Sequence, residues 1–216
     1  MSRPSITAVI ISKNEEDMIV SCLDCLQWCD EILVIDNGST DSTADLAEKK
    51  GAKVVSFKHS SFSRVRSEAL KIVGTDGLVY IDADERVTPE LAKEIQVQLE
   101  TSDNVALAFC RTNYFFGEKF EFGGWQNDVV TRAFKKSALS GWKGTIHETP
   151  TFTGSAKTLS FPLIHFSHRN VISGLYKTAS WTPMEAELFI KANEPPVTFG
   201  KILKKGVSEF INRAYF

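Results

Sequence analysis

Two aspartates, Asp82 and Asp84, stand two positions apart at the end of the apolar run LVYIDAD. Side chains at i and i+2 of an extended chain point to the same side, so we expect the two carboxylates to converge. Paired carboxylates suit a hard divalent cation that keeps several waters and shares its other ligands with phosphate oxygens. The same spacing also occurs in ordinary acidic turns, and the pair alone favours that simpler interpretation. The surrounding chain has to decide between the two.

The aspartates close the last of four strand-like runs in the first half of the chain. Each run is short and apolar, which is typical of buried strands, and each is followed by a stretch with helical periodicity. This alternation with short links predicts an α/β domain that has a mostly parallel sheet and helices on both faces. The expected strands are 6–12, 31–36, 52–57 and 78–84, and the expected helices are 13–29, 43–51, 62–74 and 88–100.

Local signals set the helix starts and the edge where a ligand belongs. We expect Asn14 to cap the first helix and Thr88 to cap the fourth, with Pro89 at the first helical position, where its missing N–H costs nothing. Ligands of parallel sheets bind beyond the carboxyl ends of the strands. The polar residues that follow the strands there are Lys13, Asn14 and Glu15, then Asp36 and Asn37, then Asp82 and Asp84.

Two more side chains are expected at this edge. Asp36 ends the second strand, where an acid can accept a hydrogen bond from a ribose hydroxyl or a base N–H. Arg66 lies on a helix that starts at the same edge, and its guanidinium could bind a diphosphate with two hydrogen bonds. Asp36 could instead cap a helix, and Arg66 could be a solvated helix residue. Their coincidence with the two aspartates favours ligand binding.

The composition is that of an ordinary globular protein. The chain has 216 residues, of which 43% are hydrophobic and 24% charged, and its net charge is −2. This balance gives no electrostatic signature for binding nucleic acid. No run approaches the roughly 18 apolar residues of a membrane-spanning helix, and no secretory segment follows Met1, so we expect a cytoplasmic location.

Three of the four cysteines, Cys22, Cys25 and Cys29, are spaced i, i+3 and i+7. On a helix this spacing places all three on one face, together with Ile19 and Leu26. No second CxxC or histidine pair completes a four-ligand metal site. We therefore expect these cysteines to pack as small apolar side chains.

The alternation of strands and helices stops near residue 105. Strands are expected at 106–117 and 158–167, with a third within 125–136, so residues 105–169 form a β-rich extension of the same domain. The stretch 170–193 is helical in pattern, with a kink or a new start at Pro183. Residues 170–216 are thus expected to form a C-terminal helical extension.

The last segment, 198–216, has two interpretations. Its apolar residues recur at helical spacing, which fits a helix that packs on the domain. Its basic residues fit an interfacial helix that docks on anionic lipid. The chain ends on Phe216, which would also be compatible with a longer natural tail. The apolar residues are Phe199, Ile202, Leu203, Val207, Phe210 and Ile211, and the basic ones are Lys201, Lys204, Lys205 and Arg213.

Four stretches of the first half carry a family resemblance. AVIISKNEE, VIDNGSTDST, FSRVRSEAL and YIDADE, in this order, resemble the family 2 glycosyltransferases, which have the Rossmann-like GT-A fold. The resemblance is strong over residues 5–100. Further along, GGWQNDVVTRAFKK and GWKGTIHETP are similar to the branch of bacterial lipopolysaccharide-core glucosyltransferases. Two positions depart from the pattern, with Ser67 where asparagine is common and Asn127 where the branch often has proline.

The resemblance implies a role for each matching position. Residues 1–104 would bind a nucleotide sugar, and 105–169 would form the acceptor side. The cofactor would be Mg²⁺ or Mn²⁺. Asn14 and Glu15 would line the nucleotide pocket, Asp36 would contact uridine, Arg66 would lie near the diphosphate, Asp82 would bridge ribose and metal, and Asp84 would ligate the metal.

The implied reaction is metal-dependent transfer of a hexose, by default from UDP-glucose, to an acceptor hydroxyl with inversion. A carboxylate must take the proton of the acceptor. Asp128 is the first candidate because it follows the glycine-rich aromatic loop expected to form the acceptor wall, and Glu148 is the second. Trp125 and His147 would lie on the acceptor or phosphate side.

The expected acceptor is a saccharide or glycolipid of the cell envelope, as in synthesis of the lipopolysaccharide core. The enzyme would then work in the cytoplasm or on the inner face of the cytoplasmic membrane, with residues 198–216 touching the membrane surface. A polyprenyl-phosphate sugar transferase or a non-catalytic binder of sugar nucleotides would share the same first half. A sugar nucleotidyltransferase would need a glycine-rich signature after the first strand, which is missing, and a haloacid-type phosphatase would need Thr or Val where Arg86 stands.

Overall fold

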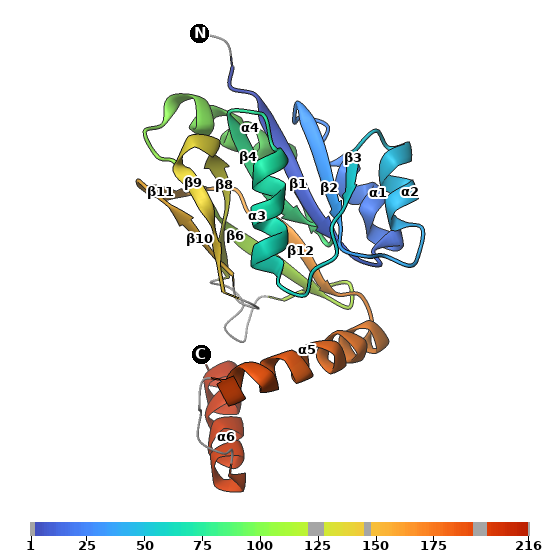
Figure 1. Cartoon of the computed structure of the whole chain (residues 1–216). Helices are drawn as coiled ribbons and strands as arrows, with labels where there is room; N and C mark the ends of the chain where they lie inside the picture. The colour runs from blue at the N-terminus through green and yellow to red at the C-terminus, as the bar shows by residue number, and fades with distance from the viewer. Residues whose placement is uncertain (1–2, 121–127, 145–147, 192–197, 216) are drawn as a thin grey trace. The chain divides into compact units, whose positions relative to one another are not determined.

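The computed structural model describes residues 3–120, 128–144, 148–191 and 198–215 (Figure 1). The chain divides into two compact units, each of which is described by itself below. The first unit comprises Met1–Arg111 and Val129–His165, and the second comprises Thr112–Asp128 and Phe166–Phe216.

The first unit is built on the predicted parallel sheet, in the order β3-β2-β1-β4. All four expected strands and the helices that follow them are present, so the predicted α/β class is confirmed. The strands are β1 (Ile6–Ser12), β2 (Glu31–Asp36), β3 (Lys53–Ser56) and β4 (Gly77–Asp82), and the helices are α1 (Glu16–Asp24), α2 (Thr43–Lys49), α3 (Phe62–Ile72) and α4 (Pro89–Thr101).

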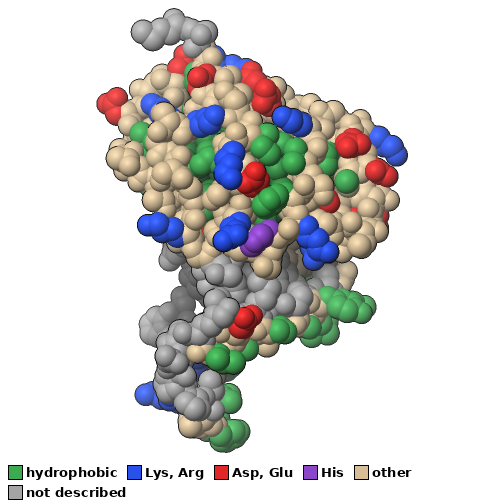
Figure 2. Space-filling model, in the orientation of Figure 1, with side chains coloured by type: hydrophobic (Ala, Val, Ile, Leu, Met, Phe, Trp, Pro, Cys, Tyr) green, Lys and Arg blue, Asp and Glu red, His purple; other side chains and the backbone are tan. Residues whose placement is uncertain are grey.

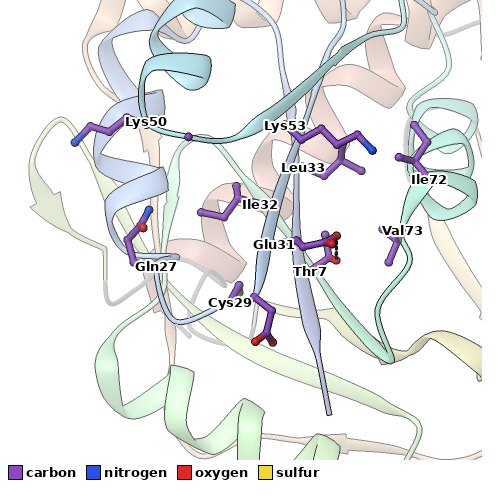
Figure 3. Close-up of a pocket in the computed structure, with 12 residues that line it drawn as sticks. Thr7, Gln27, Cys29, Glu31, Ile32, Leu33, Lys50, Lys53, Ile72 and Val73 are labelled. Carbon is purple, nitrogen blue, oxygen red and sulfur yellow. Dashed lines mark hydrogen bonds between the residues drawn. The ribbon is translucent and has the colours of Figure 1, made fainter. Parts of the chain in front are cut away.

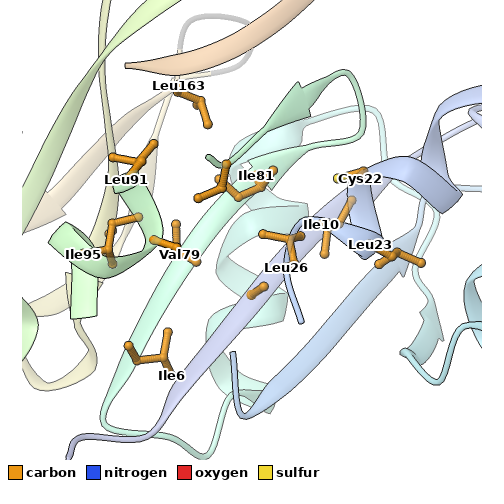
Figure 4. Packing of buried hydrophobic residues seen from close by; sticks show 14 of the residues in the cluster. Ile6, Ile10, Cys22, Leu23, Leu26, Val79, Ile81, Leu91, Ile95 and Leu163 are labelled. Carbon is orange, nitrogen blue, oxygen red and sulfur yellow. The ribbon is translucent and has the colours of Figure 1, made fainter. Parts of the chain in front are cut away.

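Helices cover both faces of this sheet. α1, α2 and α4 pack on one face, where Ile10, Leu23 and Ile95 belong to a single apolar cluster (Figure 4). α3 packs on the other face through Val65 and Ala69 (Figure 1). The strands read as continuous apolar runs because neither face of the sheet meets water. At its carboxyl end, each strand therefore stops where the first polar side chains appear.

Antiparallel strands extend the sheet beyond β4. β8 pairs with β4, β6 pairs with β8, and β12 and β5 follow, as the sequence partly predicted. A separate hairpin, β9–β10, packs its Trp142 and Phe152 against the α3 side. These elements are β5 (Glu85–Arg86), β6 (Ala106–Phe115), β8 (Val129–Lys135), a 3₁₀ turn η1 (Lys136–Ala138), β9 (Leu139–Lys143), β10 (Thr149–Phe152), β11 (Ala156–Thr158) and β12 (Leu163–His168).

The second unit contains β7 (Glu118–Lys119), α5 (Val171–Lys191) and α6 (Phe199–Tyr215). α5 continues through Pro183 rather than starting anew there. Apolar side chains lie on the surface of both helices (Figure 2). Within the described residues, no helix has the length and apolar content that crossing a bilayer requires.

Three local expectations were wrong. Asn14 does not cap α1, because the helix starts at Glu16, and Asn14 itself adopts a left-handed backbone with φ of 56°. β4 ends at Asp82 and a turn follows, so Asp84 does not continue the strand and the i, i+2 argument does not apply to the pair. Cys29 lies beyond the end of α1, although it packs against the same apolar cluster that buries Cys22.

Candidate active site

The parallel register brings the predicted polar residues to one edge of the sheet. Ser12 at the end of β1 pairs with Asp36 on β2, and its neighbour Ile11 pairs with Asp82 on β4. Asp36 and Asp82 therefore flank the end of β1, about 10 Å apart, which is two strand spacings. This is the edge at which parallel sheets bind their ligands.

Asp82 is the centre of a buried ionic cluster. Arg132 on β8 donates to both carboxylate oxygens, with Nη2 2.6 Å from Oδ2 and Nη1 3.4 Å from Oδ1. Arg66 on α3 donates from Nη2 to Oδ1 at 3.1 Å. Both arginines are at least nine-tenths buried. Asp82 thus contacts two guanidinium groups, one from Arg66, which precedes it in the chain, and one from Arg132, which follows it.

Glu85 is a second buried carboxylate of this cluster and contacts Asp82 and two arginines. Its side chain is fully buried, and its Oε2 accepts the backbone N–H of Asp82 at 2.9 Å. Its Oε1 lies 3.4 Å from Nη1 of Arg111 and 4.0 Å from Nη2 of Arg132. Glu85 therefore fixes the turn after β4 and joins it to β6 and β8.

Asp84 has a different partner from Asp82. Its Oδ2 lies 3.6 Å from Nε2 of His165 on β12. The pairing of β12 with β5, in which His165 is opposite Glu85, brings the imidazole to this turn. Asp82 and Asp84 are thus close in sequence but have different partners, since Asp82 contacts arginines and Asp84 contacts a histidine.

Aromatic rings set the orientation of Arg66. Its guanidinium carbon lies 4.9 Å from the ring centre of Trp142 and 5.4 Å from that of Tyr80. The hydroxyl of Tyr80 donates to the backbone carbonyl of Arg66 at 2.8 Å. Aromatic faces attract guanidinium groups, so the rings hold the side chain toward Asp82.

The ends of β1 and β2 are tied together by a network of loop contacts. Asp36 accepts hydrogen bonds from the backbone N–H groups of Gly38 and Ser39. Asn14 donates its N–H to Ser39 Oγ at 3.0 Å and accepts that of Thr40 on Oδ1 at 2.8 Å. The predicted nucleotide-side residues Asn14 and Asp36 therefore share one loop. Glu15 joins it through its backbone N–H, which donates to Thr43.

The cluster strongly perturbs the acidity of its members. Burial alone would raise the pKa of Asp82, but the charges of Arg132 and Arg66 and their hydrogen bonds lower it far below its ordinary value. Burial, with the nearby charge of Asp82, raises the pKa of Glu85. For Arg132, burial favours the neutral form, yet Asp82 and Glu85 raise its pKa. Asp82 is accordingly a carboxylate at any physiological pH.

Comparison with known proteins identifies the family. The model of Glycosyl transferase family 2 matches residues 7–163, which include the whole cluster around Asp82. The chain belongs to glycosyl transferase family 2.

Two relatives and one solved structure illustrate the range of similarity. An uncharacterized glycosyltransferase of Rickettsia conorii is 38% identical over 92 residues, which cover 42% of this chain and 33% of that protein, so the chain matches about a third of its length. The lipopolysaccharide core biosynthesis glycosyltransferase LpsC of Rhizobium meliloti is 30% identical, over 98% of this chain and 80% of that protein. Glucosyl-3-phosphoglycerate synthase from Mycobacterium tuberculosis, in complex with Mn²⁺, UDP and glucosyl-3-phosphoglycerate, has a TM-score of 0.54 at 18% identity, covering 89% of this chain and 81% of that one. That likeness supports the predicted GT-A fold.

The two candidate bases predicted from the sequence lie in different units. Glu148 belongs to the first unit and interacts electrostatically with Arg66, Asp82 and Arg132. Burial raises its pKa. Asp128 belongs to the second unit, where its Oδ2 accepts a hydrogen bond from Asn113 at 3.0 Å. Trp125 and His147 lie outside the described residues.

Three residues at the end of β4 were not singled out from the sequence. Arg132 stands inside a strand pattern, VVTRAFKK, and His165 inside the apolar run PLIHFS. A charged or titratable residue inside an apolar run is the signal that could have identified these two, since such residues are rarely buried without a partner. Glu85 lies between Asp84 and Arg86, and no such signal marks it.

The donor atoms near Asp84 fit a divalent cation. A carboxylate oxygen of Asp84 is a ligand that Mg²⁺ and Mn²⁺ prefer, and an imidazole nitrogen of His165, 3.6 Å away, is a ligand for a transition metal such as Mn²⁺ rather than for Mg²⁺. Both oxygens of Asp82 instead accept from arginines. Among the described residues, no group of three or more Asp, Glu, His or Cys side chains could hold a metal, so the donor phosphates and water would complete the ligand set.

A pocket at the opposite edge of the sheet does not belong to the candidate site. It is lined by Thr7 and Glu31, which lie near the amino ends of β1 and β2, and by Lys50 and Lys53 (Figure 3). Thr7 donates to Glu31 there at 3.3 Å. Because ligands of parallel sheets bind at the carboxyl edge, this hollow is not where we seek the donor.

Proposed function

We propose that this glycosyltransferase moves a hexose from a nucleoside diphosphate sugar, UDP-glucose by default, to an acceptor hydroxyl with inversion at the anomeric carbon. The observation that carries the proposal is the meeting of Asp36, Asp82 and Arg66 around the end of β1. That edge offers hydrogen-bond acceptors for a nucleoside and a guanidinium for its phosphates. The similarity to LpsC supports an acceptor in cell-envelope glycan synthesis, such as the lipopolysaccharide core.

The donor would bind with its nucleoside over the loop between Asn14, Glu15 and Asp36. Two backbone N–H groups already orient the carboxylate of Asp36. A carboxylate has further acceptor sites, which could accept a hydrogen bond from a uracil N–H or a ribose hydroxyl. Arg66 would bind the diphosphate. Its position against Trp142 and Tyr80 reduces the freedom that binding would otherwise cost.

Asp84 would hold Mn²⁺ or Mg²⁺, and His165 would join it as a ligand when the cation is Mn²⁺. When bound, the cation neutralises charge that develops on the departing diphosphate. The partners of Asp82 lead us to assign it to the arginines rather than to the first ligand set of the metal.

A carboxylate must then take the acceptor proton as the glycosidic bond forms. We propose Glu148 for this step alongside the first sequence candidate, Asp128. The raised pKa of Glu148 and its electrostatic interaction with Arg66 and Arg132 support its presence in the reacting centre. Trp125 and His147 stay predicted for the acceptor or phosphate side.

We further propose that the enzyme works on a lipid-linked acceptor at the inner face of the cytoplasmic membrane. On α6, Phe199, Leu203 and Phe210 are between 59% and 80% exposed. At about 100° per residue, Lys201 and Lys204 fall on the side away from them. A helix with an apolar face and a lysine-rich polar face suits the surface of a membrane that contains anionic lipid.

The test is an assay of UDP release and product formation with a panel of donors. The protein is incubated with Mn²⁺ and UDP-glucose, UDP-galactose or UDP-N-acetylglucosamine, and either a lipid-linked core saccharide or polyprenyl phosphate. We expect transfer from UDP-glucose to the saccharide. Transfer only to polyprenyl phosphate would select the alternative acceptor class, and nucleotide binding without transfer to either acceptor would make the protein a non-catalytic binder.

A further inference from the structure

The cluster at the end of β4 gathers three arginines at the carboxyl edge of the sheet. Five side chains are joined by direct contacts: Arg66, Arg111 and Arg132 against Asp82 and Glu85. Glu148 adds a third carboxylate, which interacts electrostatically with Arg66 and Arg132. At this edge a ligand that carries phosphate would be anionic and would meet guanidinium groups.

Asp82 is more exposed than the two arginines that it contacts. Its side chain is 30% exposed, whereas those of Arg66 and Arg132 are 6% and 11% exposed. Asp82 accepts from Nη2 of Arg66 and from Nη1 and Nη2 of Arg132. Each guanidinium group has five N–H donors, so donors that Asp82 does not engage remain for an anion.

Arg66 also carries a donor with no acceptor in the described part of the chain. Its Nε is buried and makes no hydrogen bond there. A buried N–H without a partner costs about 1–3 kcal/mol, so an unmet donor at a ligand edge indicates a place for a ligand oxygen. Burial, and after it the nearby charge of Arg132, lower the pKa of Arg66, and an anion bound beside Arg66 would oppose this shift.

Arg132 reaches this place through the register of its strand. β8 runs antiparallel to β4, with Val79 opposite Ala133, so Arg132 is one residue further toward the carboxyl end of β4. Its neighbours Ala133 and Phe134 are fully buried and fix the backbone. Its guanidinium is therefore positioned as firmly as that of Arg66, although it comes from the later half of the family match.

We infer that Arg132 is a second phosphate-binding residue of the donor site, paired with Arg66, and that Asp82 orients both guanidinium groups for the two phosphates of a nucleoside diphosphate. This inference rests on the proposed function. It adds a residue and a division of roles, because Asp82 acts through the arginines and Asp84 acts through the metal. The fork of arginine matches phosphate with two hydrogen bonds, which lysine cannot reproduce.

The test compares two ligands that differ only in phosphate. Calorimetry measures the dissociation constants of UDP and uridine for the wild-type chain, Arg132→Gln and Arg132→Lys, with thermal unfolding as a check of folding. We expect Arg132→Gln to weaken UDP roughly tenfold or more while uridine changes less than twofold, and Arg132→Lys to lie between. Arg111→Gln, which removes the same charge and its bond to Glu85, is the matched control and should weaken UDP less.

If Arg132→Gln weakens the binding of UDP and of uridine equally, Arg132 stabilises the fold and does not bind phosphate. A dissociation constant of UDP that is unchanged in Arg132→Gln would overturn the inference. If Arg132→Gln does not fold, Arg132→Lys, which keeps the charge, is compared with wild type in the same way: the inference requires that its binding of UDP weakens more than its binding of uridine. A wild-type chain that binds no nucleoside diphosphate would instead refute the proposed function, and the two failures are therefore distinguishable.

Discussion

Arg132 holds Asp82 by a two-pronged contact across neighbouring antiparallel strands, with Nη2 2.6 Å from Oδ2 and Nη1 3.4 Å from Oδ1. Arg66 shares the same carboxylate from α3. A single ionised side chain thus compensates two buried cations. Removing it would leave both without their nearest counter-charge, and this makes Asp82 important for stability as well as for binding.

Asp82 should make the stability of the fold sensitive to acid. Its pKa is lowered in the folded state, so its contribution is present above the ordinary aspartate value of about 3.9 and is lost as pH falls below it, by up to about 1.4 kcal/mol per pH unit. Asp82→Asn should be less stable than wild type at pH 7 by roughly 2–4 kcal/mol, and the gap should narrow toward pH 3. Urea unfolding at several pH values measures this. Asp103→Asn, at an exposed position, is the control, and a gap that does not change with pH would contradict the assignment.

Asp84 and His165 should control the metal requirement. Asp84→Asn and His165→Gln each remove one ligand, so the Mn²⁺ concentration for half-maximal stabilisation by UDP should rise tenfold or more. A thermal-unfolding titration with Mn²⁺ at fixed UDP gives that value without any turnover. Glu100→Gln, which removes an exposed carboxylate from α4, should leave it unchanged. If both ligand variants titrate like wild type, the metal is held elsewhere.

The base can be identified by separating turnover from binding. The variant that removes it, Glu148→Gln or Asp128→Asn, should lower kcat about a hundredfold or more and leave the dissociation constant of UDP nearly unchanged. If Glu148 is the base, its raised pKa should move the acid limb of the kcat profile above the ordinary glutamate value of about 4.3. A hundredfold loss in Asp128→Asn alone would select Asp128, and full activity in both variants would exclude the pair.

α6 should bind anionic vesicles in a salt-dependent way. Replacing Lys201, Lys204 and Lys205 by glutamine should weaken sedimentation with vesicles of phosphatidylglycerol by tenfold or more, because each lysine near such a surface contributes about 1 kcal/mol. Lys49, Lys53 and Lys93, replaced together, are the matched control for lost charge. Concentration-dependent dimerisation that is lost in Phe210→Ser, with no vesicle binding, would show that the apolar face of α6 meets a second copy of the chain instead.

The sequence predicted the sheet because its strands are buried on both sides and its helices are amphipathic. The location of Asp36, Asp82 and Arg66 at one edge could be predicted from the sequence, since the carboxyl ends of parallel strands lie at a common edge of the sheet. The turn after Asp82 could not be read in the same way. The extended-chain argument for Asp82 and Asp84 failed because Glu85 takes up the N–H of Asp82 and bends the chain at that point.

The remaining members of the site depend on pairings between distant segments. Arg132 and His165 reach the cluster through β8 and β12, whose order in the sheet is set by long-range packing rather than by local pattern. The hairpin β9–β10, which carries Trp142 to Arg66, was missed because its strands are short and only half-buried. Nothing in a local window indicates which aromatic ring will meet which arginine.

The most direct test of the central claim is a thermal-unfolding panel of UDP, GDP, CDP, ADP and dTDP, each with and without Mn²⁺. A ligand that binds only the folded state stabilises it by RT ln(1 + [L]/Kd), so at equal concentration the tightest ligand gives the largest rise in unfolding temperature. The account predicts that UDP gives the largest rise, that Mn²⁺ increases it, and that Asp84→Ala abolishes the increase due to Mn²⁺. No rise with any of these nucleotides, with or without the metal, would contradict it.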